Sequence, residues 1–272
     1  MSMIEKVKNF FGLSRVPFSK SVGAHELFQS RHLKEACARL EIALENEDIA
    51  LHTGFVGCGK SSALRAFTSS LDHSRYRVAY VPAFSCKIGE IAKLVLSELQ
   101  MEVPFHPYTA FRKLKEGVLS LHSQKGLKTI IILDEAQEVL PKTLSSLKNL
   151  VNFNMDSTNL LLLILCGQKE LADTLRLEPL ESLNRRIRIR YHMQGLSLEE
   201  TSLYISHQMK LCGVEKAVFT DDTKSQIYSI SKGVISHINR LCFELLLYAV
   251  SQAKEIVEPS MIDRIASSSP SP

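Results

Sequence analysis

Short apolar segments alternate with amphipathic segments over residues 49–192 of this 272-residue chain. The segment Thr129–Leu133 is almost continuously apolar, which is typical of a strand buried on both faces of a sheet. Residues 186–190 alternate between arginine and isoleucine, as a half-buried strand does. Because helical segments separate these runs, we expect an α/β fold with a five-stranded parallel sheet between helices. The five predicted strands cover residues 49–52, 77–81, 129–133, 159–166 and 186–190.

Apolar positions three or four residues apart predict helices between these strands. They cover residues 31–45, 62–67, 88–99, 111–121 and 140–153. After Gly195 only the helical spacing remains, and Ser197 with Glu200 forms a capping box that opens a helix ended by Gly213. Two more helices are predicted, one from Thr220 to about Ser231 and one over residues 238–249. The second part of the chain is therefore expected to be a small helical domain.

Composition is that of an ordinary globular protein, with 45% hydrophobic and 23% charged residues. The net charge of +4 permits a polyanionic partner without requiring one. The six cysteines are widely spaced and suit a reduced, cytoplasmic protein better than a disulfide framework. The N-terminus lacks the apolar core of a signal peptide, and the longest apolar run, Leu160–Cys166, is far too short to span a bilayer. We expect a soluble protein with no membrane partner.

A glycine-rich segment, Gly54–Ser62, fits the phosphate-loop pattern G-x-x-x-x-G-K-[ST]. Its glycines allow backbone N–H groups to turn around phosphate oxygens, its lysine supplies a charge for the β- and γ-phosphates, and its first serine is a Mg²⁺ ligand. The predicted strand before it and helix after it give the required context, so a chance glycine turn is the weaker interpretation. The residues predicted to hold the nucleotide are Gly54, Val56, Gly57, Cys58, Gly59, Lys60, Ser61 and Ser62.

Acidic residues follow the third predicted strand directly. We expect this strand beside the phosphate-loop strand, so that Asp134 can reach the Mg²⁺ together with Ser61. The next carboxylate, Glu135, can take a proton from the attacking water. An acidic pair that only caps a helix is the alternative, and the phosphate loop makes it the weaker one.

Polar residues after the fourth strand and before the fifth are further candidates. Gln168 follows the fourth strand, which in the usual order lies between the two strands just named, and it can contact the γ-phosphate or the water. A plain turn explains it equally well. Arg185 and Arg186 precede the fifth strand, where an arginine of ring-forming ATPases reaches into the neighbouring subunit's site. A solvated edge strand is the alternative, and we favour it for Arg188 and Arg190.

These motifs give the chain a family resemblance. It resembles AAA+ ATPases of the ExeA kind, a group that includes transposition regulators of the TnsC and TniB type. The segments that carry the resemblance are Phe10–Leu13 with Pro17–Phe18, the phosphate loop, Leu133–Gln137, Leu165–Leu171, Arg186–Arg188, and Gly233 with Ile238–Cys242. The resemblance implies an AAA+ P-loop NTPase fold, ATP and Mg²⁺ as cofactors, and self-assembly into a ring or helical filament of hexamer-like or heptamer-like geometry.

On this basis we divide the chain into four regions. Residues 1–48 form an irregular N-terminal strap and a helix that pack on the ATPase core, and residues 49–195 form the P-loop ATPase domain. Residues 196–266 form a helical lid domain, and residues 267–272 form a disordered tail. The aromatic strap either covers the core or forms a wall for the nucleotide base; both remain open.

One position departs from the family pattern. Members usually have Gly-x-Pro-Arg at the lid helix, with the arginine as a sensor of the γ-phosphate, whereas this chain has Ser236 at the arginine's place. The sensor role is either lost or passed to His237 or Arg240. We therefore expect slow hydrolysis and a nucleotide that serves more as an assembly switch.

Two functions follow from the resemblance. The first is an ATP-dependent, oligomerising regulator of DNA transposition, with double-stranded DNA and a transposase as partners. Its candidate DNA contacts are Lys87, Lys93, Arg112 and Lys113, which a solvated helix face explains equally well. The second is a nucleotide-switched ATPase of secretion or envelope assembly with no DNA role. Secretion-type members carry a membrane span and an envelope-binding domain that we do not find in this sequence, so we favour the first. A metabolic P-loop kinase is a weaker third, because no acceptor pocket is evident.

Overall fold

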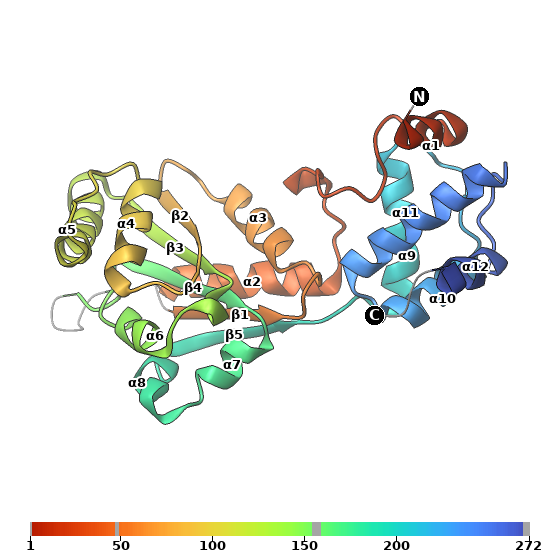
Figure 1. Cartoon of the computed structure of the whole chain (residues 1–272). Helices are drawn as coiled ribbons and strands as arrows, with labels where there is room; N and C mark the ends of the chain where they lie inside the picture. The colour runs from red at the N-terminus through yellow and green to blue at the C-terminus, as the bar shows by residue number, and fades with distance from the viewer. Residues whose placement is uncertain (1, 47–48, 154–158, 269–272) are drawn as a thin grey trace. The chain divides into compact units, whose positions relative to one another are not determined.

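The computed structural model describes residues 2–46, 49–153 and 159–268, and its contacts divide the chain into two compact units. One unit consists of residues 33–55 and 60–193 and contains the sheet. The other consists of residues 1–32, 56–59 and 194–272 and is helical. We describe each unit by itself (Figure 1).

The sheet is five-stranded and parallel, with the order β2-β3-β4-β1-β5. Its strands are β1 (Ile49–Gly54), β2 (Tyr76–Pro82), β3 (Lys128–Asp134), β4 (Leu161–Gly167) and β5 (Ile187–Met193). Every residue of β1 and β4 is buried, which explains why these strands read as continuous apolar runs. The predicted fold class is confirmed.

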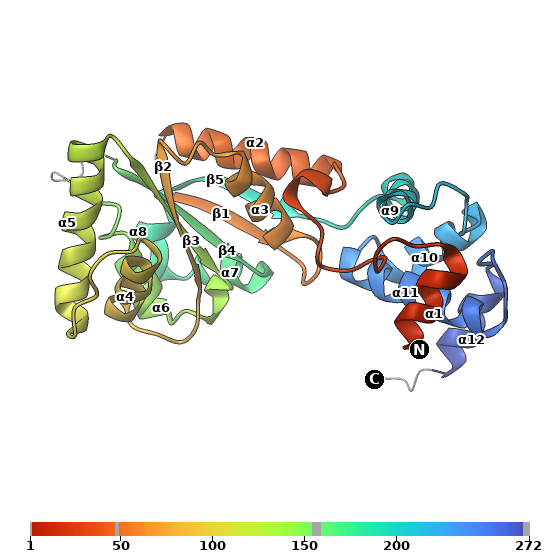
Figure 2. The same cartoon turned by 90° about the horizontal axis from the view of Figure 1, so that it is seen from above.

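Helices cover both faces of this sheet (Figure 2). On one face, α2 (Arg31–Asn46) and α3 (Lys60–Ser70) pack on alternate strand residues such as Ile132 and Ile164. On the other face the chain packs the remaining helices, whose bounds are α4 (Ile88–Glu98), α5 (Pro107–Lys125), α6 (Pro141–Leu147), α7 (Lys169–Thr174) and α8 (Glu181–Asn184). Successive residues of a central strand point to opposite faces of the sheet, so they pack against different sets of helices.

The helix predicted over residues 140–153 is too long. α6 ends at Leu147, after which Asn149 and Leu150 donate their backbone N–H groups three residues back and form turns. Leu150, Val151 and Phe153 remain buried in the core although they lie outside the helix. Their apolar spacing reports burial, while two asparagines in this segment disfavour continued helix.

The helical unit contains α1 (Met3–Phe11), α9 (Leu198–Leu211), α10 (Asp221–Ser231), α11 (Ile235–Ser251) and α12 (Ser260–Ser268). The predicted capping box at the start of α9 is present, because Ser197 Oγ accepts from the Glu200 N–H and the Glu200 carboxylate accepts from the Ser197 N–H. Thr220 caps α10 by a single bond, because its Oγ1 accepts from the Thr223 N–H. The predicted tail begins inside α12, and its residues 269–272 lie outside the described part of the chain.

The N-terminal strap differs from the expectation in two ways. It is not irregular throughout, because a capping box between Ser2 and Glu5 starts α1 and Gly12, at φ 69°, ends it. It also belongs to the helical unit and not to the sheet unit. Phe11 and Phe18 are buried in the helical core, and the Phe18 ring lies 6.1 Å from that of Phe219. Residues 1–32 therefore contribute their aromatic side chains to the helical unit's core.

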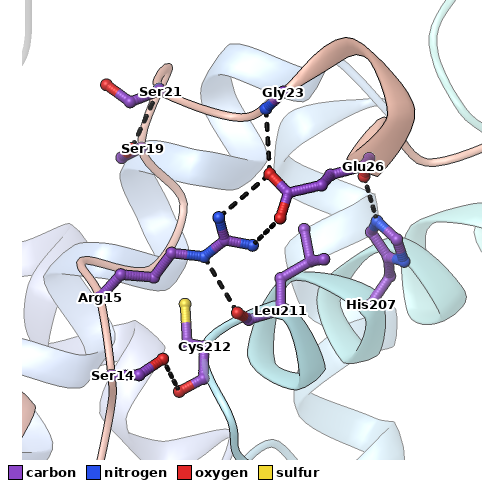
Figure 3. A network of polar contacts seen from close by, with 9 residues as sticks. All are labelled: Ser14, Arg15, Ser19, Ser21, Gly23, Glu26, His207, Leu211 and Cys212. Carbon is purple, nitrogen blue, oxygen red and sulfur yellow. Dashed lines mark hydrogen bonds and ion pairs between the residues drawn. The ribbon is translucent and has the colours of Figure 1, made fainter.

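A polar clasp ties the strap to α9 (Figure 3). The Arg15 guanidinium donates to both carboxylate oxygens of Glu26, at 3.1 and 2.8 Å, and its Nε donates to the Leu211 carbonyl at 2.9 Å. The Gly23 N–H donates to the same carboxylate, and His207 Nε2 lies 2.8 Å from the Glu26 carbonyl oxygen. The bond from Arg15, with that from the Gly23 N–H, lowers the pKa of Glu26 to about 2.

No helix in the part of the chain that the structure describes has the length and apolar character needed to cross a membrane.

Candidate functional site

The phosphate-loop segment has the backbone that its sequence pattern predicts. β1 ends at Gly54 and α3 begins at Lys60. Gly57 and Gly59, between them, have φ values of 76° and 104°, in the left-handed region that residues with a Cβ rarely adopt. Glycine is therefore required here by conformation.

The Lys60 ammonium group is held at this loop. Its side chain is buried, and Nζ donates to the carbonyl oxygens of Gly54 at 2.9 Å and Phe55 at 3.0 Å. Ser61 is exposed in the first turn of α3, an 11-residue helix whose N-terminus favours anions. A fixed cation, two left-handed glycines and a helix N-terminus fit the phosphates of a nucleotide.

Asp134, at the end of β3, is buried and accepts two hydrogen bonds. Tyr80 Oη donates to Oδ2 at 2.6 Å, and the Glu135 N–H donates to Oδ1 at 3.0 Å. Burial, followed by the bond to Asp134, raises the pKa of the Tyr80 phenol. Tyr80 was not among the predicted site residues. The available signal was the position of Tyr80 two residues before the end of β2, whose Pro82 pairs with Asp134.

β4 lies between β3 and the phosphate-loop strand β1, as predicted for the fourth strand, so β3 and β1 are not direct neighbours. Cys166 on β4 pairs in register with His52 on β1, and Leu165 before it pairs with Leu133 before Asp134, so Cys166 lies between His52 and Asp134 across the sheet. Burial, then the charge of Asp134, raises the pKa of the Cys166 thiol. Asp134 is thus connected to the phosphate-loop strand through Cys166 and His52.

His52 continues this row of side chains. It is buried, and its ring lies parallel to that of Tyr191 on β5 at a centroid distance of 6.0 Å. Neither ring nitrogen has a hydrogen-bond partner among the residues that the structure describes. Burial, followed by the charge of Lys60, lowers the pKa of His52 to about 4. The ring is therefore neutral near pH 7.

Glu135 and the end of β4 are joined by a residue that the sequence analysis did not single out. Gln137 Nε2 donates to Glu135 Oε2 at 2.6 Å, and Gln137 Oε1 accepts from the Gln168 N–H at 3.1 Å. Glu135 is exposed and Gln168 is half-buried. The structure thus brings Asp134, Glu135 and Gln168 together at the carboxyl edge of the sheet.

The two arginines lie elsewhere on the sheet unit. Arg185 is exposed and pairs with Glu181 at 2.5 Å, while Arg186 Nη1 donates to the Lys148 carbonyl at 3.4 Å. Both precede β5, whose Ile187 pairs with Ile49 at the start of β1. Because the phosphate loop follows the carboxyl end of β1, the arginines lie at the opposite end of the strands, where β1 and β5 begin. They are too far along the strands to act on the loop of their own chain.

The basic residues considered for DNA lie on and near α4 and α5. Lys93 Nζ donates to the Phe105 carbonyl, Lys113 pairs with Glu102, and Arg112 lies 3.5 Å from Glu116. Lys87 is exposed just before α4. Two aromatic side chains in the same segment, Phe105 and Tyr108, are 86% and 85% exposed. Partners within the chain therefore occupy several of the cations, while the aromatic rings face solvent.

The described residues hold no cluster of three or more His, Cys, Asp or Glu side chains that could bind a metal ion. At nucleotide sites Mg²⁺ is bound by one or two protein oxygens together with substrate phosphates and waters. Ser61 and Asp134 are the residues that would supply those oxygens.

Residues 43–175 match the family model described as an AAA domain. The chain is 30% identical over 247 residues to general secretion pathway protein A of Aeromonas hydrophila, which covers 89% of this chain and 45% of that protein. The chain therefore spans less than half the length of this curated relative.

Solved structures share the fold. Cdc6p of Pyrobaculum aerophilum has a TM-score of 0.73 at 16% identity, covering 92% of this chain and 69% of that one. The ORC2 protein of Aeropyrum pernix, in ADPNP–ADP complexes, has a TM-score of 0.70 at 18% identity, covering 94% and 72%. The matches support the predicted resemblance to AAA+ ATPases of the ExeA kind. They do not bear on the TnsC and TniB type, which stays a prediction.

Proposed function

We propose that this chain hydrolyses ATP at the Lys60 loop with Glu135 as general base, and the match of residues 43–175 to an AAA domain supports an ATPase. In this reaction a water oxygen forms a bond to the γ-phosphorus while the bond from that phosphorus to the β–γ bridging oxygen breaks. The water proton passes to the Glu135 carboxylate, and ADP and phosphate leave.

Each residue has one task in this proposal. Lys60 and the loop N–H groups bind the phosphates, and Gln168 orients the γ-phosphate or the water. Mg²⁺, held by Ser61 and Asp134, would neutralise charge that develops on the phosphate oxygens. The observation that carries the proposal is the geometry of Lys60, a buried ammonium group held by the Gly54 and Phe55 carbonyls at the start of α3.

Phosphate release from ATP tests the role of Glu135. Glu135→Gln keeps the shape of the side chain but cannot take the proton, so turnover should fall about 100-fold or more while ATP binding persists. Glu138→Gln is the matched control, since Glu138 is exposed three residues later. Equal turnover in the wild type and Glu135→Gln would refute the assignment.

We further propose that a neighbouring subunit completes the site through Arg186. The arginine's distance from its own loop along the strands supports action in trans. Arg186→Ala should abolish most turnover, and Lys60→Met should do the same by a different route. A mixture of the two variants should recover part of the activity, because Lys60→Met subunits still supply Arg186 to intact loops. Absence of recovery, with mixed oligomers present in sedimentation, would refute this proposal.

For the biological role, we propose a nucleotide-switched assembly ATPase of the ExeA kind. The match to general secretion pathway protein A supports this alternative at least as well as the transposition role. Ser236 stands in place of the expected lid arginine, which suits a site that holds nucleotide for a long time and hydrolyses it slowly. Sedimentation with ADP and with a slowly hydrolysed ATP analogue tests the switch; an unchanged oligomeric state would contradict it.

DNA binding is the second candidate, as part of a regulator of transposition that also contacts a transposase. The exposed rings of Phe105 and Tyr108, in the same region of the chain as Lys87 and Arg112, favour it, because aromatic and basic side chains together suit nucleic acid. Filter binding of duplex DNA at low salt, with and without ATP, is the test. Lys87→Glu with Arg112→Glu should weaken ATP-dependent binding, whereas Lys34→Glu, on an exposed face of α2, should not. No ATP-dependent binding would rule this candidate out.

A further inference from the structure

The side-chain amide of Gln137 bridges two segments that come from different strands. Its NH₂ group donates to Glu135 Oε2 at 2.6 Å, and its oxygen accepts from the Gln168 N–H at 3.1 Å. A carboxylate can only accept and a backbone N–H can only donate, so this is the one orientation of the amide that satisfies both partners. The bridge therefore links the end of β3 to the end of β4 in a defined direction.

The backbone of Glu135 is held in an uncommon conformation beside this bridge. Its φ of 54° lies in the left-handed region, which costs a residue with a Cβ about 1 kcal/mol or more. The Glu135 N–H donates to the Asp134 carboxylate at 3.0 Å, and the Glu135 carbonyl accepts from the Glu138 N–H at 2.9 Å. Such strain persists where the surrounding contacts enforce it, and it concentrates at functional sites.

β4 is shaped to admit the amide. A Cβ on Gly167 would lie 2.5 Å from Gln137 Oε1 and 3.0 Å from Leu171 Cδ2. Gly167 is not among the residues with positive φ, so its backbone would accept alanine. A methyl group at this position would therefore displace the amide oxygen of Gln137, which is the nearest atom to it.

We propose that Gln137 is a positioning residue for hydrolysis, which holds the Glu135 carboxylate in fixed register with the Gln168 end of β4. The proposal rests on the proposed function of Glu135 as general base. Glu135 is exposed, and without the bridge its side chain would sample several rotamers. Since small misplacement of a reacting group costs a large factor in rate, the bridge should act on the chemical step and leave nucleotide binding unchanged.

Steady-state kinetics of Gln137→Ala separate this role from a structural one. The expected result is a kcat about tenfold lower, with KM and the affinity for a fluorescent ATP analogue within about twofold of wild type. Gln137→Glu has the same length but presents a second carboxylate to Glu135, so it should not restore kcat. Gln226→Ala, at an exposed position of α10, is the control. An unchanged or raised kcat in Gln137→Ala would overturn the proposal.

Gly167→Ala provides a second, geometric test. Alone it should lower kcat by displacing the amide, whereas in Gln137→Ala the colliding oxygen is gone and the added methyl should have little further effect. Equal losses in both backgrounds, at matched melting temperatures, would show that Gly167 does not act through Gln137.

The Glu135→Gln background distinguishes this proposal from the proposed function. If Glu135→Gln lowers turnover about 100-fold and the double variant with Gln137→Ala has the same residual turnover, Gln137 acts through Glu135, as proposed. If Glu135→Gln abolishes turnover but Gln137→Ala alone retains full kcat, only the role of Gln137 fails. If Glu135→Gln retains turnover, the general-base assignment fails and the role of Gln137 fails with it.

Discussion

Two polar networks, one in each unit, differ in how well their members are satisfied. In the clasp of the helical unit, every nitrogen of the Arg15 guanidinium and both oxygens of Glu26 have partners. In the row across the sheet, His52 has two buried nitrogens without partners among the described residues, and Glu135 has a left-handed backbone. Satisfied networks stabilise a fold, whereas strain and unmet polar groups concentrate at functional sites. The difference supports the proposal that the chemistry takes place at the carboxyl edge of the sheet, and it suits a structural task for the clasp.

The largest expected effect tests whether the sheet edge holds nucleotide at all. Lys60→Met retains the apolar length of the side chain and removes its charge, so affinity for ATP should fall about 100-fold, or roughly 3 kcal/mol. Equilibrium titration with a fluorescent ATP analogue measures this. Lys34→Met, which changes an exposed lysine on α2, is the control. Similar ATP affinity in both variants would show that Lys60 does not bind the nucleotide.

The next effect concerns His52 in the row, and it appears in folding stability and not in nucleotide affinity. Its pKa is about 4 in the folded protein against 6.5 for an ordinary histidine. Between these values the unfolded chain binds more protons, so the free energy of unfolding falls as the pH drops from about 6.5 toward 4. His52→Phe removes this dependence, which amounts to about 3 kcal/mol at most. Urea unfolding at several pH values, with His122→Phe as an exposed control, measures the difference. Parallel pH curves for wild type and His52→Phe would contradict it.

The clasp should respond to pH in another range. Because the folded pKa of Glu26 is depressed from 4.5 to about 2, its contribution to stability is present above pH 4.5 and is lost as the pH falls toward 2. Arg15→Met should lower the melting temperature by a few degrees at pH 7, with ATP turnover close to wild type. The difference in melting temperature between Arg15→Met and wild type should become smaller below pH 4.5. A gap that does not depend on pH would show that Arg15 stabilises the strap by packing alone.

The smallest effect concerns Tyr80, which belongs to the row but has a satisfied hydroxyl. Tyr80→Phe removes the 2.6 Å hydrogen bond to Asp134 and should reduce the free energy of unfolding by about 1 kcal/mol. Turnover should stay within about threefold of wild type, since the carboxylate itself remains. A loss of turnover as large as that of Glu135→Gln would show that Tyr80 has a direct part in the reaction.

Much of the α/β unit could be predicted from the sequence, because strands buried on both faces and amphipathic helices leave periodic patterns. Thr129–Leu133 became the core of β3, and the fourth strand lies between the other two as the usual order implies. Gln137 and Tyr80 could not be predicted, because each acts through a partner on another strand or beyond a turn. The strap could not be assigned to a unit either. The apolar character of Phe11 and Phe18 predicts that they are buried, but it does not tell which of the two cores they join.

The sequence by itself determined that a phosphate loop exists, since Gly57, Gly59 and Lys60 are required by local backbone geometry and charge at a fixed spacing. It also determined the acidic pair after β3. Only the tertiary structure decided which side chains surround that pair. Strand register brings Cys166 and His52 into one row with Asp134, and a turn brings Gln137 to Glu135. Local chemistry is encoded by neighbours in the chain, whereas its positioning depends on contacts between strands that no short segment specifies.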